Sequence, residues 1–326
     1  MNKSANVYIK RGFYALLILI LLSSSKCGRT YKVIQTEKAQ KAAVAKRTKN
    51  LISIIKGISY TEVSRKFDNG LSFSSVGYQL VPEWRISFPS VDSVNIYSPK
   101  KRQFLNAPVV FDHDSIFNVA WAWLKLKQLS KDSLKFMVLH VQDNVIQDEK
   151  VHVFMSFYSN NYIKNVLHSD TNQLWRPTKK DTLYIKEKVL LANRIPDSAF
   201  AGTEPVLLTS KNKLVSVKNE APDEAVDGGK SYDSYLSPTY DIAIHKAYDD
   251  FSYSFTAWVD DKGNLTFRKS IISLDFLGAE GKKSYINTLK GITEGYLKLY
   301  LNITPGKTLG IPHTSIIFLN VRGYKK

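Results

Sequence analysis

The chain has 326 residues and a single cysteine, Cys27, which stands close behind an apolar run near the N-terminus. A body without any other thiol cannot form disulfide bonds or a cysteine metal site, so packing alone must hold it together. The roughly 300 residues that follow, in a chain that is 44% hydrophobic and 12% aromatic, suffice for one or two sizeable cores. We therefore predict about two packed domains behind a short N-terminal segment.

The apolar run extends from Phe13 to Leu22, with Lys10 and Arg11 before it and three serines after it. A helix that spans a membrane needs about 20 apolar residues, because each residue adds about 1.5 Å against a core about 30 Å thick. Ten residues are too few. Basic, apolar and small residues in this order are typical of an export signal, so we predict that residues 1–26 form a signal peptide.

The stretch from Leu22 to Cys27 resembles the lipobox of bacterial lipoproteins, although Lys26 stands where a small residue is usual. The resemblance implies cleavage before Cys27 and lipid attachment to its thiol. Residues 28–30 contain no acidic residue, and by resemblance this implies an outer-membrane location facing the periplasm. Two alternatives are cleavage after Ser25, which would secrete the protein, and an uncleaved short anchor.

The formal net charge of +17 is concentrated near the N-terminus, where residues 28–57 hold eight basic residues and one acidic residue. Such a charge often indicates nucleic-acid binding, but an exported protein meets little nucleic acid. Membrane lipids or cell-wall anions are therefore the expected partners. We predict that residues 27–57 form a basic helical tether, which is either solvated or lies on anionic lipid.

The body of the chain is predicted to be α+β, with a mixed domain over residues 58–208. Alternating apolar residues, Pro and Gly predict strands at 84–88, 94–97, 133–142, 150–158, 182–185 and 189–191, and a buried helix at 116–129. If the strands at 133–142 and 150–158 pair about Ile146, Met137 faces Met155 and His140 faces His152. His113 could add a third metal ligand, but we interpret these as ordinary histidines and predict no metal or cofactor.

The C-terminal part is predicted to follow a linker or long loop at residues 209–238, which is polar and rich in Gly and Pro. Within residues 239–326 we expect a helix at 241–249, a hairpin with strands 251–259 and 265–270, a helix at 278–289, and strands at 296–303 and 313–321. The hairpin turn contains Gly263 and Asn264, which tolerate positive φ.

Residues about 240–322 resemble the C-terminal domain of the TonB energy transducers. The residues that support the resemblance are Phe255-x-Ala-x-Val259-Asp-Asp-Lys-Gly263-Asn-Leu265, Gly306-Lys307, Ile311-Pro312 and Ile316-Ile-Phe318. The resemblance implies a small α+β module that binds an extended peptide of an outer-membrane protein by adding it as a strand to a sheet edge. The candidate edge-strand residues are Tyr296, Leu297, Leu299, Leu301, Ile303, His313, Ser315, Ile317 and Leu319.

The favoured interpretation is therefore an exported, lipid-anchored and non-enzymatic envelope protein with a TonB-like protein-binding module. One alternative is an envelope enzyme that acts on cell-wall or glycan material, with catalysts among the 29 acidic residues. Another is a structural lipoprotein that links membrane to wall. No catalytic motif identifies a nucleophile or a base.

Overall fold

The computed structural model describes residues 38–40, 43, 46, 50–112, 115–143, 145–148, 150–220 and 233–325, with about 25% helix and 43% strand. The predicted signal peptide and Cys27 lie outside the described residues. The described positions between 38 and 53 are helical. None of the helices among the described residues has the length and apolar character needed to cross a membrane. The mixed α and β content agrees with the predicted α+β class.

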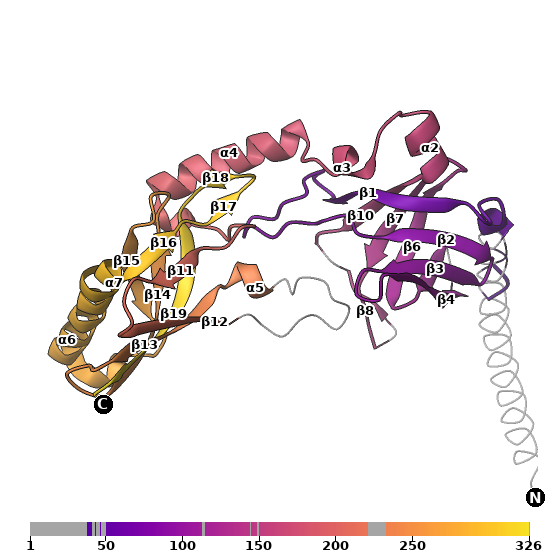
Figure 1. Cartoon of the computed structure of the whole chain (residues 1–326). Helices are drawn as coiled ribbons and strands as arrows, with labels where there is room; N and C mark the ends of the chain where they lie inside the picture. Colours follow the sequence, from indigo (N-terminus) through magenta and orange to yellow (C-terminus); the bar gives the residue numbers. More distant parts are fainter. Residues whose placement is uncertain are drawn as a thin grey trace, which may run out of the picture.

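The first half of the chain forms a closed antiparallel barrel with the strand order β1-β10-β7-β6-β5-β4-β3-β2 (Figure 1). Its strands are β1 (Ser59–Phe67), β2 (Arg85–Ser90), β3 (Ser93–Ser98), β4 (Gln103–Phe111), β5 (Ile116–Val119), β6 (Ala122–Leu129), β7 (Ser133–Leu139) and β10 (Val153–Ser159). The short hairpin of β8 (Val141–Gln142) and β9 (Val145–Ile146) extends between β7 and β10. Closure gives every barrel strand a neighbour on both sides, although β1 and β2 pair over only three residues.

Aromatic rings fill the barrel. The rings of Phe117, Phe136 and Phe157 form a chain of edge-to-face contacts with centroids 5.7 and 5.6 Å apart. Each of these rings is at most 2% exposed. The core also contains Tyr60, Ile86, Phe88, Val94, Val109, Leu124, Leu134 and Met155. Side chains therefore occupy the middle of this barrel, as is common with eight strands.

The predicted helix at 116–129 is wrong, because this segment forms the β5–β6 hairpin of the barrel. The turn contains Ala120 at φ 57° and the exposed Trp121. Phe117 and Leu124 pair across the two strands, and both are buried in the core. A dense apolar run is compatible with a buried helix or with paired strands, and barrel closure decided between them.

The strands at 84–88, 94–97, 133–142 and 150–158 are confirmed in type, but the register predicted for the last two is wrong by one residue. Met155 lies opposite Phe136, and Phe157 lies opposite Leu134. A shift of one residue exchanges the faces of a strand, so Phe136 points into the barrel and Met137 does not. The predicted register assumed that the two strands pair symmetrically about Ile146. The β8–β9 hairpin, which contains Ile146, interrupts that pairing.

Helices connect the barrel to the second half of the chain: α2 (Asn160–Asn165), α3 (Thr171–Leu174) and α4 (Lys179–Arg194). Helix α4 replaces the strands predicted at 182–185 and 189–191. Ile185, Val189 and Ala192 recur at helical spacing and pack against Phe73 and Phe200. Phe73 belongs to the β1–β2 connection, which leaves the barrel and reaches α4 (Figure 1).

The second half contains a five-stranded sheet in the order β12-β13-β19-β14-β15. Its strands are β12 (Val215–Glu220), β13 (Thr239–His245), β14 (Phe251–Val259), β15 (Leu265–Ser270) and β19 (Ser315–Tyr324). Strands β13 and β19 are parallel, and the other neighbours are antiparallel. Helix α6 (Gly278–Lys290) and the π-helix η3 (Gly291–Leu297) contribute Leu289 and Leu297 to the core of this sheet.

Shorter elements complete this half. Strand β11 (Leu207–Ser210) pairs with β16 (Leu301–Thr304), and β17 (Lys307–Thr308) pairs with β18 (Ile311–Pro312). Two 3-10 turns, η1 (Pro196–Ser198) and η2 (Asp275–Leu277), and the short helices α5 (Asp233–Leu236) and α7 (Lys298–Tyr300) lie between the larger elements.

Three predictions for this half are confirmed and three are wrong. The hairpin of strands 251–259 and 265–270, the helix near 278–289 and the final strand are confirmed. The predicted helix at 241–249 is strand β13 for most of its length, and the predicted strand at 296–303 is helical up to Tyr300. The predicted linker at 209–238 contains β12, whose six residues pair with β13 and extend the sheet.

Candidate functional site

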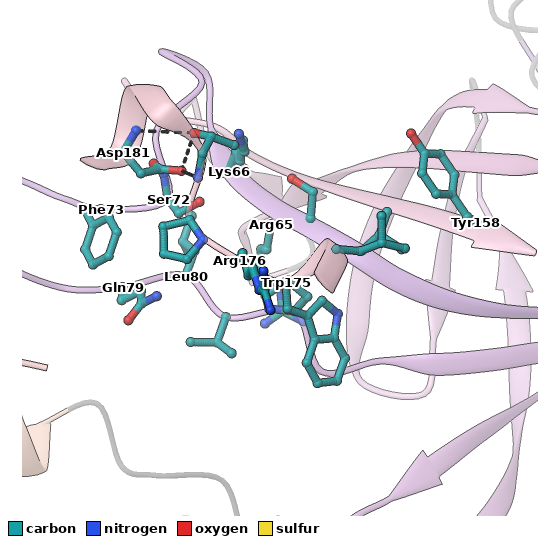
Figure 2. A pocket seen from close by; sticks show the side chains of 17 residues that line it. Arg65, Lys66, Ser72, Phe73, Gln79, Leu80, Tyr158, Trp175, Arg176 and Asp181 are labelled. Carbon is teal, nitrogen blue, oxygen red and sulfur yellow. Dashed lines mark hydrogen bonds between the residues drawn. The ribbon is translucent and has the colours of Figure 1, made fainter. Parts of the chain in front are cut away.

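A cleft of about 300 Å³ lies where the open end of β1 meets the β1–β2 connection and the α3–α4 connection (Figure 2). Strand β1 pairs with β2 only from Ser59 to Thr61, and beyond this point the two strands separate. The separated strands leave room for side chains from α3 and α4. The lining residues include Arg65, Lys66, Phe73, Leu80, Tyr158, Trp175, Arg176 and Asp181.

The base of this region is organised by Glu62, a carboxylate that is completely buried. Its Oε1 accepts a hydrogen bond from Arg65 Nε at 2.8 Å, and its Oε2 accepts one from Arg65 Nη2 at 2.7 Å. The backbone N–H groups of Glu83 and Trp84 also donate to Oε2, at 2.9 and 3.0 Å. A buried carboxylate is tolerated when such charge-assisted partners replace its hydration.

A β-bulge makes this arrangement possible. The β1–β10 register shifts between Glu62 and Ser64, so one extra residue is accommodated in β1. After the bulge Arg65 lies opposite Met155, and before it Glu62 lies opposite Phe157. Both partners on β10 are buried in the barrel core, so Glu62 and Arg65 share the inward side of β1 and meet there.

Trp175 forms one wall of the cleft. Its indole Nε1–H donates to the backbone carbonyl of Glu62 at 2.7 Å, which fixes the ring against β1. Arg176 follows directly and is exposed. Figure 2 shows the Trp175, Arg176 and Arg65 side chains close together in the cleft.

The carboxylate of Asp181 connects the helix to the β1–β2 connection. Thr178 and Asp181 form a capping box at the start of α4, in which Thr178 N–H and Oγ1 donate to Asp181 Oδ2 at 3.0 and 2.6 Å. Ser72 N–H donates to Asp181 Oδ1 at 2.7 Å. The oxygens of this buried carboxylate are therefore engaged in holding the cleft walls together.

The cleft combines positive charge with apolar walls. Its lining includes the basic residues Arg65, Lys66 and Arg176 but a single acidic residue, Asp181. This arrangement suits recognition of an anion. Among the described residues, no group of three or more His, Cys, Asp or Glu side chains could hold a metal ion. His140 and His152 are described, whereas His113 lies outside the described residues.

Sequence reasoning did not identify Glu62, Arg65 or Asp181 as site residues. The pattern Thr178-x-x-Asp181 is a capping box and could have indicated the start of α4. Glu62 stands between Tyr60 and Val63 in β1, and Arg65 three residues later could have indicated a buried ion pair, since acidic residues are rarely buried unless paired.

The predicted edge-strand residues do not lie on one open edge. Strand β19, which contains Ser315, Ile317 and Leu319, has β13 and β14 as neighbours and is the central strand of the sheet. Leu301 and Ile303 belong to β16, which pairs with β11. The remaining predicted residues lie in helices or just before β19: Tyr296 and Leu297 in η3, Leu299 in α7, and His313 in the preceding connection.

The outer strands of the sheet are β12 and β15, and no other described strand pairs with their outer sides. On β15, the carboxylate Oε1 of Glu294 accepts from the Phe267 N–H at 3.2 Å, so part of that edge is capped by η3. Most of β12 is exposed, with Ser216, Lys218, Asn219 and Glu220 all at the surface. Strand β12 therefore presents the more accessible edge.

His313 is buried where Phe200 meets the β17–β18 hairpin. Its ring stacks on Phe200 with centroids 3.8 Å apart and an angle of 10°. Its Nδ1 lies 3.1 Å from the Thr314 carbonyl oxygen, which can only accept, so Nδ1 carries the proton and Nε2 accepts from Thr308 Oγ1 at 3.0 Å. Burial lowers the pKa of His313 to about 4. The neutral ring therefore has a structural role in holding the segments together.

Neither the scan of protein-family models nor the search of curated proteins finds a match. Among solved structures, the bovine lipocalin allergen Bos d 2 is similar at 13% identity, and the alignment covers 44% of this chain and 87% of that chain with a TM-score of 0.24. A TM-score this low supports no conclusion about fold or function.

Proposed function

We propose that this protein is an exported envelope protein, anchored by lipid at Cys27, that binds an extended segment of an outer-membrane protein through its C-terminal sheet. The basic segment behind Cys27 adds electrostatic attraction to anionic lipid. The role is non-enzymatic. The TonB-like resemblance supports this proposal, but the binding edge is moved from the last two predicted strands to β12.

The single observation that carries the proposal is the position of β12 at the end of the sheet, where no other described strand pairs with its outer side. His245 N–H donates to the Leu214 carbonyl, and Val215 lies opposite Ile244, which sets the alternation of the β12–β13 ladder. The alternation directs the N–H and C=O groups of Val217 and Asn219 away from β13. An extended peptide can pair with these groups through its own backbone.

The charges of β12 and its neighbour explain how an open edge avoids self-association. Lys218 and Glu220 are exposed on β12, and charged side chains on an edge disfavour pairing between identical sheets. The neighbouring Asp241 carboxylate raises the pKa of the Glu220 carboxyl group, because the protonated Glu220 carboxyl can donate a hydrogen bond to Asp241 and the two negative charges repel each other. A partner strand would need side chains that are compatible with both the positive Lys218 and the acidic Glu220.

Hydrogen–deuterium exchange tests the proposed edge. The protein is incubated with and without detergent-solubilised bacterial outer membranes, and the expected result is slower exchange at the Val217 and Asn219 amides. Asn219→Pro removes one outward N–H without removing a bond to β13, so it should abolish the protection. Asn219→Ala keeps the N–H and serves as the matched control. Unchanged exchange in the unsubstituted protein would refute strand addition at β12.

A second experiment tests the anchor. Mass spectrometry of the mature N-terminus should show a chain that begins at a lipid-modified Cys27, and the protein should sediment with membranes. Cys27→Ser should release it into the soluble fraction. A mature protein that begins at Lys26, carries no lipid and washes free of membranes would contradict the anchoring proposal.

A further inference from the structure

The cleft beside β1 has no part in strand addition at β12. We propose that this cleft binds a small organic anion, namely a carboxylate or phosphate monoester joined to a ring or compact apolar group. The inference does not depend on the proposed function, because it rests on the lining of the cleft alone.

The charge of the cleft favours an anionic ligand. Among the described residues, neither Lys66 nor Arg176 forms an ion pair, and both line the cleft. Asp181, the acidic residue of the lining, is surrounded by donors from Ser72 and Thr178. The positive charge of Lys66 and Arg176 is therefore available to an anion that enters from solvent.

The base and one wall of the cleft are held in place before any ligand binds. Two hydrogen bonds from Arg65 to the buried Glu62 carboxylate fix the guanidinium at the base of the cleft, where the Arg65 side chain is only 12% exposed. Trp175 is fixed by its bond to the Glu62 carbonyl. A ligand would meet a rigid base and wall, so little side-chain entropy would be lost on binding.

The size and apolar lining of the cleft favour a small ligand with a ring. The buried Phe73 and Leu80 contribute apolar surface to the lining, and so do the Trp175 indole and Pro177. A volume of about 300 Å³ lies at the small end of ligand sites, which suits one ring with one anionic group. Because Lys66 and Arg176 lie beside apolar walls, the cleft should bind anions that carry an apolar group more tightly than inorganic anions.

The walls belong to separate parts of the chain, since Lys66 lies on β1, Phe73 in the β1–β2 connection and Arg176 in the α3–α4 connection. A ligand that contacts all three would bind the folded protein and not the unfolded chain. Binding should therefore raise the melting temperature, and above the Kd the rise should follow the logarithm of the ligand concentration. This gives a second readout besides affinity.

Isothermal titration calorimetry of the full protein with phenyl phosphate, benzoate and the neutral benzyl alcohol tests the proposal. We expect at least one of the two anions to bind and to raise the melting temperature, with an affinity that decreases as salt is added. Arg176→Gln should weaken binding about tenfold or more, and Lys66→Gln should weaken it in the same direction. Lys101→Gln, at an exposed turn between β3 and β4, is the matched control and should bind normally.

Each alternative outcome has a defined meaning. Preference for phenyl phosphate over benzoate, or the reverse, identifies the anionic group and supports the proposal. If benzyl alcohol bound as tightly as the anions, anion recognition would be refuted. If Lys101→Gln weakened binding as much as Arg176→Gln, overall surface charge would explain the effect and the cleft proposal would be refuted. Absence of heat and of a melting shift with both anions would overturn the proposal. None of these results affects the exchange and fractionation experiments on β12 and Cys27.

Discussion

Replacement of Glu62 by Gln should destabilise the barrel far more than an ordinary polar substitution. The carboxylate is completely buried, and its two oxygens accept two bonds from Arg65 and one each from the Glu83 and Trp84 amides. An amide of the same shape retains one acceptor oxygen and turns an NH₂ group toward a donor. It also leaves the Arg65 guanidinium, which is 12% exposed, without its counter-charge.

Breaking a buried ion pair by removing one partner costs about 3–5 kcal/mol. We expect Glu62→Gln to lower the free energy of unfolding by about this amount, measured by urea denaturation with tryptophan fluorescence. The double variant Glu62→Leu, Arg65→Met removes both charges and should lose less, about 1–3 kcal/mol for the amides left without an acceptor. A loss below about 1 kcal/mol for Glu62→Gln would refute the assignment of Glu62 as a buried, charged organiser of the cleft.

Three further predictions concern other contacts. The depressed pKa of His313, about 4, means that the unfolded chain binds a proton that the folded chain does not between about pH 6.5 and 4. Stability should therefore fall by up to about 3 kcal/mol as pH is lowered through this window, and His313→Gln should flatten the pH dependence of the urea midpoint. Gly77 has φ 94°, and a Cβ there would collide with the Ala201 carbonyl, so Gly77→Ala should cost about 1–3 kcal/mol by thermal denaturation; an unchanged melting temperature would contradict the contact. Thr178→Ala removes the capping box of α4 and should cost about 1 kcal/mol, whereas the exposed Lys179→Ala should be nearly neutral.

Local chemistry accounts for the parts of the fold that sequence reasoning obtained correctly. The hairpin around Gly263 was predictable because a glycine with φ 81° and its alternating flanks act within a few residues. Helix α6 was also predictable, because its helical pattern is contained within about a dozen consecutive residues. In contrast, β13 was predicted as a helix, because nothing local reveals that Tyr240 and Ile242 pair in parallel with a strand about 80 residues later in the sequence.

The candidate cleft could not be predicted from the sequence either, because local sequence does not reveal long-range contacts. Glu62 and Phe73 precede Trp175 and Asp181 by about 100 residues, and only the return of the chain through α3 and α4 brings the two pairs together. The edge-strand prediction failed because the position of a strand within a sheet is a property of the whole sheet. Strand β19 is central, so its backbone groups already have partners on both sides.

The sequence by itself determined that this body has no disulfide framework, since its single cysteine lies at position 27, and that turns and helix starts follow local residue chemistry. Tertiary structure alone decided which apolar runs became strands, which strand became an edge, and where buried charges meet. The physical reason is that each segment could pair its backbone N–H and C=O groups in a helix or in a sheet. Long-range strand pairing and closure of the barrel selected one of these alternatives.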